Sequence, residues 1–194
     1  MAPSGYTVAV EPSAVNVANG LTVARILCTP PLILLVLATP EGSYIAAAVF
    51  GALALTDALD GHLARTRNLI TTLGKLLDPF ADKLLVGGAL LALVATDRLA
   101  MVVAVIIIAR EVLVSVLRQV AFREGVVVPA GTLGKAKMAL QVTMILALLA
   151  FGPASSPVLQ VLVIATVAMT IMSGLSYLSA IPRMRVAREG AAAG

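Results

Sequence analysis

Long apolar runs alternate with short polar stretches along most of this chain. The runs are too long for strands and show no period of two, so they predict helices. Short turns, several with proline or glycine, separate them and make neighbouring helices antiparallel. Pro30 and Pro31 lie inside the first run and are expected to kink that helix. We expect six helices, at about residues 16–38, 44–65, 72–95, 99–123, 135–152 and 157–181.

The composition indicates that these helices cross a membrane. Of the 194 residues, 60% are hydrophobic and only 12% are charged, whereas globular domains carry roughly 25% charged residues. The mean hydropathy is +1.02. We therefore expect an all-α integral membrane protein with six transmembrane helices. Its expected parts are a flexible or interfacial N-terminal lead at 1–15, a membrane domain at 16–182 and a basic C-terminal tail at 183–194.

The distribution of positive charge predicts the orientation. Both termini, the 66–71 connector and the 123–134 loop can be assigned to one side of the membrane. All of the 14 Lys and Arg residues except Arg98 then lie on that side or in the helix halves nearest to it. Cytoplasmic segments carry such an excess of Lys and Arg. We therefore expect a multi-pass protein of the cell membrane, with its polar site facing the cytoplasm.

Four aspartates in this half of the membrane form the main polar group. Asp57 and Asp60 end the second predicted helix, and Asp78 and Asp82 begin the third. Spacings of three and four residues place each pair on one helix face. A short connector makes the two helices an antiparallel hairpin, so the four carboxylates can meet at one level. Two divalent cations would neutralise them, and oxygen ligands favour Mg²⁺, Mn²⁺ or Ca²⁺ over Zn²⁺ or copper.

A pair of such cations is suited to phosphoryl chemistry. Gly61 and Gly74 would let a ligand approach the backbone closely, and Arg65 could pair with a phosphate. The alternative is that the aspartates are solvated helix ends and that the glycines only help helices to pack. Four carboxylates interleaved with glycines and an arginine favour a functional site, since ionisable groups are costly within a membrane.

The order Asp57-x-x-Asp60-Gly61-x-x-Ala64-Arg65-x8-Gly74-x3-Asp78-x3-Asp82 resembles the signature of the CDP-alcohol phosphotransferase family. The resemblance implies six helices, a homodimer, and attack of an acceptor hydroxyl on a CDP-linked lipid with release of CMP. It also implies two bound cations, Mg²⁺ or Mn²⁺, with Asp82 as the general base and a further metal contact. The implied metal ligands are Asp57, Asp60, Asp78 and Asp82, and the implied nucleotide-site residues are Gly61, Ala64, Arg65 and Gly74.

Basic residues in the second half of the chain bear on the acceptor alcohol. Arg110 and Arg118 are eight residues apart and lie roughly on one helix face, and Lys135 and Lys137 open the next helix. We expect Arg110, Arg118 and Lys135 to bind a phosphate on the acceptor. The alternative is snorkelling towards lipid headgroups, which we favour for Lys137. Arg110 and the adjacent Glu111 could also satisfy each other.

Two further stretches resemble members of this family that use glycerol 3-phosphate. They are AREVLVSVLRQVA (109–121) with VVPAGTLGKAKMALQ (127–141), and NVANGLTVARI (16–26), where Ala18 replaces the usual proline. The resemblance implies transfer of a phosphatidyl group from CDP-diacylglycerol to glycerol 3-phosphate. Membrane lipids are the other expected partners, and no nucleic acid is expected. The residues expected near the nucleotide from the opening stretch are Asn19, Thr22 and Arg25.

Other functions remain open from the sequence. A related enzyme could use inositol phosphate or another alcohol, and a cardiolipin-forming enzyme is a more distant alternative. A cation transporter could use the aspartates as a binding site. Transporters tend to place such sites at the membrane midplane, between two repeated halves. Residues 99–194 contain no matching acidic cluster, which favours an enzyme.

Overall fold

The computed structural model describes residues 17–66, 72–123, 132–153 and 156–192. It describes the side chains of these residues except at 17–18, 57–66, 72–76 and 179–192. All regular structure in these ranges is helical, which confirms the predicted class. The helices are α1 (Val17–Ala38), α2 (Tyr44–Thr66), α3 (Thr72–Ala95), α4 (Met101–Arg123), α5 (Thr132–Phe151) and α6 (Pro157–Ala192).

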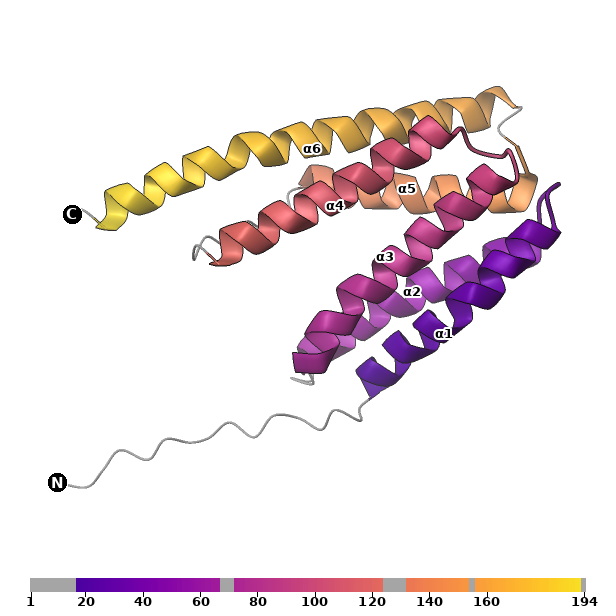
Figure 1. Ribbon diagram of the computed structural model, residues 1–194, viewed down its shortest axis with the longest axis horizontal. Helices are drawn as coiled ribbons and strands as arrows, with labels where there is room; N and C mark the ends of the chain where they lie inside the picture. Colours follow the sequence, from indigo (N-terminus) through magenta and orange to yellow (C-terminus); the bar gives the residue numbers. More distant parts are fainter. Residues whose placement is uncertain (1–16, 67–71, 124–131, 154–155, 193–194) are drawn as a thin grey trace, which may run out of the picture.

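One predicted boundary needs correction. The sixth helix was expected to end near residue 181, but α6 continues to Ala192 and projects beyond the other helices (Figure 1). The predicted basic tail is therefore an extension of α6. Pro182 removes one backbone hydrogen bond without ending the helix, and the alanine, arginine and methionine residues that follow it have high helix propensity. α1 includes Pro30 and Pro31 within one helix, and the kink expected there stays a prediction.

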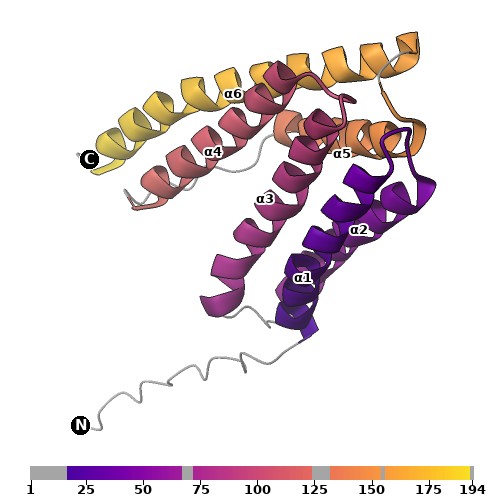
Figure 2. The same ribbon diagram turned by 45° about the vertical axis from the view of Figure 1, so that its right-hand side comes forward.

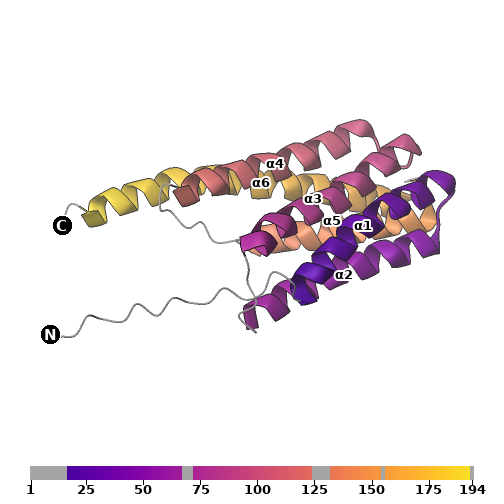
Figure 3. The ribbon, with the colours of Figure 1, turned by 60° about the horizontal axis from the view of Figure 1, so that its bottom comes forward.

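The helices pack as a ring in the order α1, α2, α5, α6, α4, α3. Figures 1 and 2 show α1 next to α2 and α3, and α4 next to α6. α3 and α4 are close at their connecting turn and diverge away from it, which Figure 3 shows from another side. Within the described residues, α2 and α3 contact each other little, whereas α1 packs extensively against both. The predicted α2–α3 hairpin is therefore held together mainly by α1.

α1 approaches α3 closely at a glycine. A Cβ atom at Gly88 would lie 2.7 Å from Ile33 Cδ1 and 3.7 Å from Thr29 Cγ2. Thr29 is fully buried, and its hydroxyl donates to the carbonyl oxygen of Arg25 at 2.8 Å. The absence of a side chain at Gly88 thus lets the two helices pack without a gap. This contact fixes the position of α3, which carries two of the motif aspartates.

The apolar core occupies one end of the ring. It lies in the helix halves next to the turns 39–43 and 96–100, an end that we call the loop end. The opposite end, where α2 ends and α3 begins, is the aspartate end. Fully buried core side chains include Leu32, Val36, Phe50, Leu85, Leu90, Leu93, Ile107, Met144, Ile145 and Leu148. A smaller group of Val114, Ala121 and Tyr177 joins α4 to α6. Among the described side chains, tight apolar packing is therefore concentrated at the loop end.

Hydrogen bonds between turns close the loop end. The Ser43 amide donates to the carbonyl oxygen of Leu149 at 2.6 Å, and Arg98 Nε donates to the carbonyl oxygen of Pro40 at 2.7 Å. Arg98, the one basic residue assigned to this side of the membrane, is buried. Burial lowers the pKa of the Arg98 guanidinium, and the charge of nearby Glu41 opposes that shift. Arg98 is thus a structural part of the loop end.

Gly152→Ala is expected to lower the free energy of unfolding by about 2 kcal/mol, since the site combines backbone strain with a steric clash. Gly152 has a φ of 80°, and a Cβ atom there would collide with the carbonyl oxygen of Glu41. Gly87→Ala is the control, because a Cβ atom at Gly87 meets no atom within 4 Å. Thermal unfolding in detergent would compare the two variants. Equal stabilities would contradict this account of the loop end.

Large apolar side chains cover the outside of the bundle, as expected for a membrane protein. Leu27, Leu34, Val158 and Ile164 are each at least 67% exposed. Within the described ranges, three helical segments are long and apolar enough to span a bilayer: Asn19–Ala38, Thr132–Phe151 and Pro157–Leu178. Charged and other polar residues interrupt the remaining helices. The chain is a helical membrane protein.

Candidate active site

The signature motif spans two helices in the predicted way. Its first half lies in the last part of α2 and its second half in the first half of α3. For most of the motif, the structure describes the helix but not the side chains. These residues are Asp57, Asp60, Gly61, Ala64, Arg65 and Gly74. The structure therefore places these residues by their helices alone, and the predicted meeting of all four aspartates stays a prediction.

The polar face of α1 meets the aspartates of α3. Thr22 Oγ1 donates a hydrogen bond to Asp78 Oδ1 at 2.6 Å. Thr22 and Arg25 are fully buried and Asn19 is nearly so. Their spacing of three residues places them along one face of α1. α1 therefore positions Asp78 directly, which gives Thr22 a structural link to the motif.

Asp82 lies one helical turn after Asp78 on the same face of α3. Its carboxylate interacts electrostatically with Arg25 of α1 and, more weakly, with Lys137 of α5. The residue is only partly exposed. Charges from three helices thus meet around Asp82, at the inner side of the ring.

The donor set suits a hard divalent cation. Asp78 and Asp82 present only carboxylate oxygens, the ligands that Mg²⁺ and Mn²⁺ prefer. Among the side chains that the structure describes, no group of three or more His, Cys, Asp or Glu residues occurs. A complete site would thus need Asp57 and Asp60 from α2, as the motif implies.

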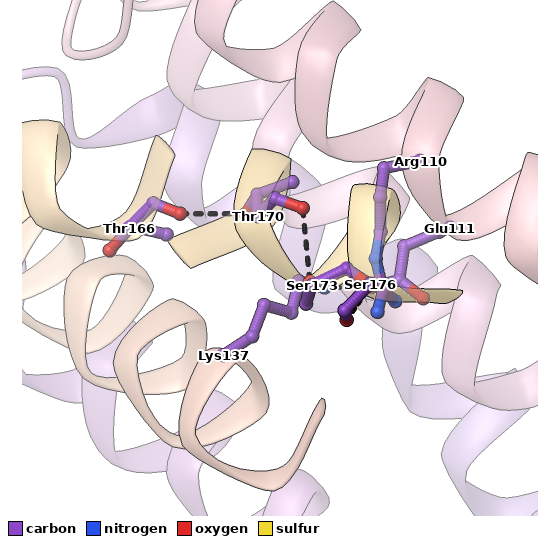
Figure 4. Close-up of polar contacts among 7 residues, drawn as sticks. All are labelled: Arg110, Glu111, Lys137, Thr166, Thr170, Ser173 and Ser176. Carbon is purple, nitrogen blue, oxygen red and sulfur yellow. Dashed lines mark hydrogen bonds and ion pairs between the residues drawn. The ribbon is translucent and has the colours of Figure 1, made fainter. Parts of the chain in front are cut away.

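A second charged group joins α4 to α5. Lys137 pairs with Glu111, whose Oε1 atom also lies 3.7 Å from Arg110 Nη1. Lys137 is 2% exposed. Figure 4 shows Arg110, Glu111 and Lys137 converging beside Ser173 and Ser176 of α6. We call Arg110, Glu111, Arg118 and Lys137 the basic cluster.

α6 supports the two arginines of the basic cluster. The Arg118 guanidinium carbon lies 5.7 Å from the ring centroid of Tyr177, and Arg118 Nε donates to the Tyr177 hydroxyl at 3.4 Å. A Cβ atom at Gly174 would lie 3.4 Å from Arg110 Cγ. Gly174 thus lets the stem of Arg110 pack directly against α6. Both arginines are held on the side of α4 that faces α6.

Hydroxyl groups line the inner face of α6 (Figure 4). Thr170 donates to the carbonyl oxygen of Thr166 at 2.6 Å, and Ser173 donates to that of Thr170 at 3.0 Å. Both hydroxyls are buried. Because each hydroxyl hydrogen is used within α6, the oxygen atoms can only accept hydrogen bonds from other groups. This face can therefore stabilise cations or bind donor groups.

The predicted acceptor residues are only partly brought together. Arg110 lies in the basic cluster, where it and Lys137 both contact Glu111. The contact between Arg110 and Glu111 agrees with the alternative interpretation of the sequence. Arg118 is bound to Tyr177, while Lys135 is exposed at the start of α5. Lys137 was expected to snorkel towards lipid headgroups, and this interpretation is wrong because the side chain is buried in an ion pair.

Comparisons with known proteins agree with the motif. A family model described as CDP-alcohol phosphatidyltransferase matches residues 15–172. The chain is similar to proteins named CDP-diacylglycerol–glycerol-3-phosphate 3-phosphatidyltransferase from Rickettsia bellii (37% identity, covering 85% of this chain and 94% of the relative) and Bacillus subtilis (36%, covering 84% and 94%). It is also similar to a probable phosphatidylglycerophosphate synthase from Mycobacterium tuberculosis (37%, covering 84% and 80%). This helical membrane protein belongs to the CDP-alcohol phosphatidyltransferase family.

Proposed function

We propose that the protein transfers a phosphatidyl group from CDP-diacylglycerol to glycerol 3-phosphate, giving phosphatidylglycerol phosphate and CMP. The relatives with this name match over most of the chain. The observation that carries the proposal is the position of Lys137. Its ammonium group is close enough to interact electrostatically with both Asp82 and Arg110. It therefore connects the motif with a group suited to an acceptor phosphate.

The aspartates would activate the two substrates. Asp82 accepts the proton of the glycerol 3-phosphate hydroxyl, whose oxygen forms a bond to the lipid-side phosphorus. The bond from that phosphorus to the CMP oxygen breaks, and CMP leaves. Asp78 is oriented by Thr22, and Asn19 and Arg25 lie on the same face of α1 for nucleotide contact. When bound to the four aspartates, two Mg²⁺ or Mn²⁺ ions would neutralise the pyrophosphate oxygens.

The charge of the basic cluster favours a phosphate-bearing acceptor. Three cations and one carboxylate leave a surplus of two positive charges, which a phosphate dianion would balance. A serine or free inositol acceptor would leave this surplus unpaired. An enzyme using inositol phosphate is the second candidate, because it would need the same charge. The name and extent of the relatives favour glycerol 3-phosphate.

The orientation and assembly belong to this proposal. We place all six helices across the cell membrane, with the aspartate end facing the cytoplasm. In support, the loop end holds one basic residue of the described helices and turns, and that residue is buried. A soluble phosphorylated acceptor would then reach the site from the cytoplasm. We further propose a homodimer, as the family resemblance implies, which cross-linking in native membranes would test.

An acceptor screen tests the function. Purified protein in detergent would receive CDP-diacylglycerol, Mg²⁺ or Mn²⁺ and one alcohol per reaction, with CMP release as the measurement. We expect release with glycerol 3-phosphate and dependence on the cation. Release with inositol phosphate instead would keep the reaction and change the acceptor. No release with any alcohol would overturn the proposal and return attention to cation transport.

Lys137→Met is expected to raise the KM for glycerol 3-phosphate about 10- to 100-fold, the value of one lost charge-assisted hydrogen bond. Lys135→Met is the matched control, since this exposed side chain lies two residues away, and a change below about twofold is expected there. Steady-state kinetics with each substrate varied would separate the acceptor from the CDP-lipid. A larger effect from Lys135 would assign the phosphate contact to Lys135, as the sequence predicts.

A further inference from the structure

The Lys137–Glu111 pair joins two residues with very different access to solvent. Lys137 is 2% exposed, whereas the Glu111 side chain is 30% exposed. A buried ammonium group without an anionic partner is strongly unfavourable. A carboxylate with this exposure can instead be hydrated when it is released. Lys137 thus requires an anion at all times, but that anion can be exchanged.

Glu111 occupies the position where an incoming anion would bind. Its Oε1 atom contacts Lys137 Nζ and also lies 3.7 Å from Arg110 Nη1. One carboxylate oxygen therefore serves two cations that come from different helices. Glu111 is itself on α4, next to Arg110 in the sequence, so it can leave Lys137 and remain close to Arg110. A phosphate oxygen could then take over the contact with Lys137.

We propose that Glu111 is an internal counter-ion that the acceptor's phosphate displaces from Lys137. This inference rests on the proposed function and adds a residue that sets acceptor selectivity. Glu111 keeps the buried cation paired in the empty site and competes with every incoming anion. A carboxylate replaces it with little electrostatic gain, while a phosphate dianion gains more. The competition therefore favours phosphorylated alcohols over acceptors that carry only a carboxylate.

Glu111 could instead hold Lys137 in place for the substrate, and the two roles predict opposite results. Removal of a competitor strengthens anion binding, whereas removal of a positioning group weakens it. Glu111→Gln separates the roles because it removes the charge and keeps the shape. Glu41→Gln is the matched control, since Glu41 is an exposed carboxylate at the loop end, far along the chain from the basic cluster.

The first experiment measures phosphate binding without turnover. Thermal unfolding of the detergent-solubilised protein would be followed against inorganic phosphate, with chloride keeping the ionic strength constant. Glu111→Gln should lower the Tm without phosphate and lower the half-saturating phosphate concentration about three- to fivefold, since a partly exposed ion pair no longer competes. Glu41→Gln should leave the half-saturating phosphate concentration as in the wild type. Weaker or unchanged phosphate binding in Glu111→Gln would overturn the proposal.

The second experiment uses the acceptor. The KM for glycerol 3-phosphate should fall by a similar factor in Glu111→Gln, with a smaller change in kcat. Glu111→Asp keeps the charge on a shorter side chain and should shift the KM less, in the same direction; it also replaces Glu111→Gln if that variant does not fold. A raised KM in either variant would assign Glu111 a positioning role. If phosphate binds as expected but glycerol 3-phosphate is not an acceptor, only the proposed function fails.

Discussion

Asp78→Ala is expected to reduce CMP release by about 10³-fold or more, because it removes a carboxylate at the centre of the proposed cation site. It also removes the acceptor of the 2.6 Å hydrogen bond from Thr22. Residual activity should not be restored by higher Mg²⁺ or Mn²⁺. The measurement is CMP release across a titration of each cation, on protein whose thermal unfolding matches that of the wild type.

Thr22→Val serves as a graded control for Asp78. It keeps the carboxylate and removes only the hydroxyl that orients it, so a loss of about 10- to 100-fold is expected. Higher cation concentrations should recover part of this loss, since the ligand itself remains. Cation-independent turnover by Asp78→Ala would contradict the proposed role of the aspartates. A Thr22→Val variant as inactive as Asp78→Ala would indicate that α1 contributes more than orientation.

Asp82→Asn is expected to retain binding of CDP-diacylglycerol and to lower kcat about 10²- to 10⁴-fold, the usual contribution of a general base. Asparagine keeps the size of the side chain and can still offer one oxygen to a cation. It cannot accept the proton of the acceptor hydroxyl. Equilibrium binding of the CDP-lipid and single-turnover kinetics would measure the two effects separately.

Asp97→Asn is the matched control for Asp82. Asp97 is an exposed carboxylate at the loop end with a φ of 55°, a conformation that asparagine also tolerates. The same chemical change there should leave CMP release within about twofold of the wild type. Normal turnover by Asp82→Asn would remove this residue from the role of base. Loss of CDP-lipid binding would instead indicate a mainly metal- or nucleotide-binding role.

The fold class and most helix positions follow from hydrophobic patterning alone. The end of α6 did not, because Pro182 and the following arginines resembled the end of a membrane span. A span can leave the bilayer and remain helical, since helix propensity does not depend on hydrophobicity. The order of the helices around the ring was also not predictable. Sequence proximity favoured direct α2–α3 packing, whereas the glycine contact at Gly88 favours α1 against α3.

The burial of Lys137, in contrast to the exposure of Lys135, follows from a pattern in the sequence. Leu148, Met144 and Gln141 are buried at helical spacing on α5, and the same spacing leads to Lys137. Lys135 lies about 200° away around the helix. The pairing with Glu111 is different, because it depends on how α4 and α5 pack. A single sequence without the packing could not supply it.

The sequence predicted the helix faces of the motif residues but not their tertiary contacts. The spacing placed Asp78 and Asp82 on one face of α3, and the opening stretch named Thr22 as a polar residue of the first helix. The hydrogen bond between Thr22 and Asp78 joins residues 56 positions apart, so it needed the fold. Tyr177 as the partner of Arg118 was missed for the same reason. Local periodicity predicts which face a residue occupies, but not what that face contacts.

The apolar core and the hydrogen bonds between turns at the loop end should make this end of the bundle resistant to local unfolding. Local opening is cheapest where few buried apolar contacts must be broken. Among the described side chains, the buried apolar contacts and the hydrogen bonds between turns lie at the loop end, so this end should open last. α3 and α4 are close together at their connecting turn and separate with distance from it (Figure 2). The turns that join α1 to α2 and α3 to α4 should therefore be among the last parts of the bundle to lose their protection from hydrogen exchange.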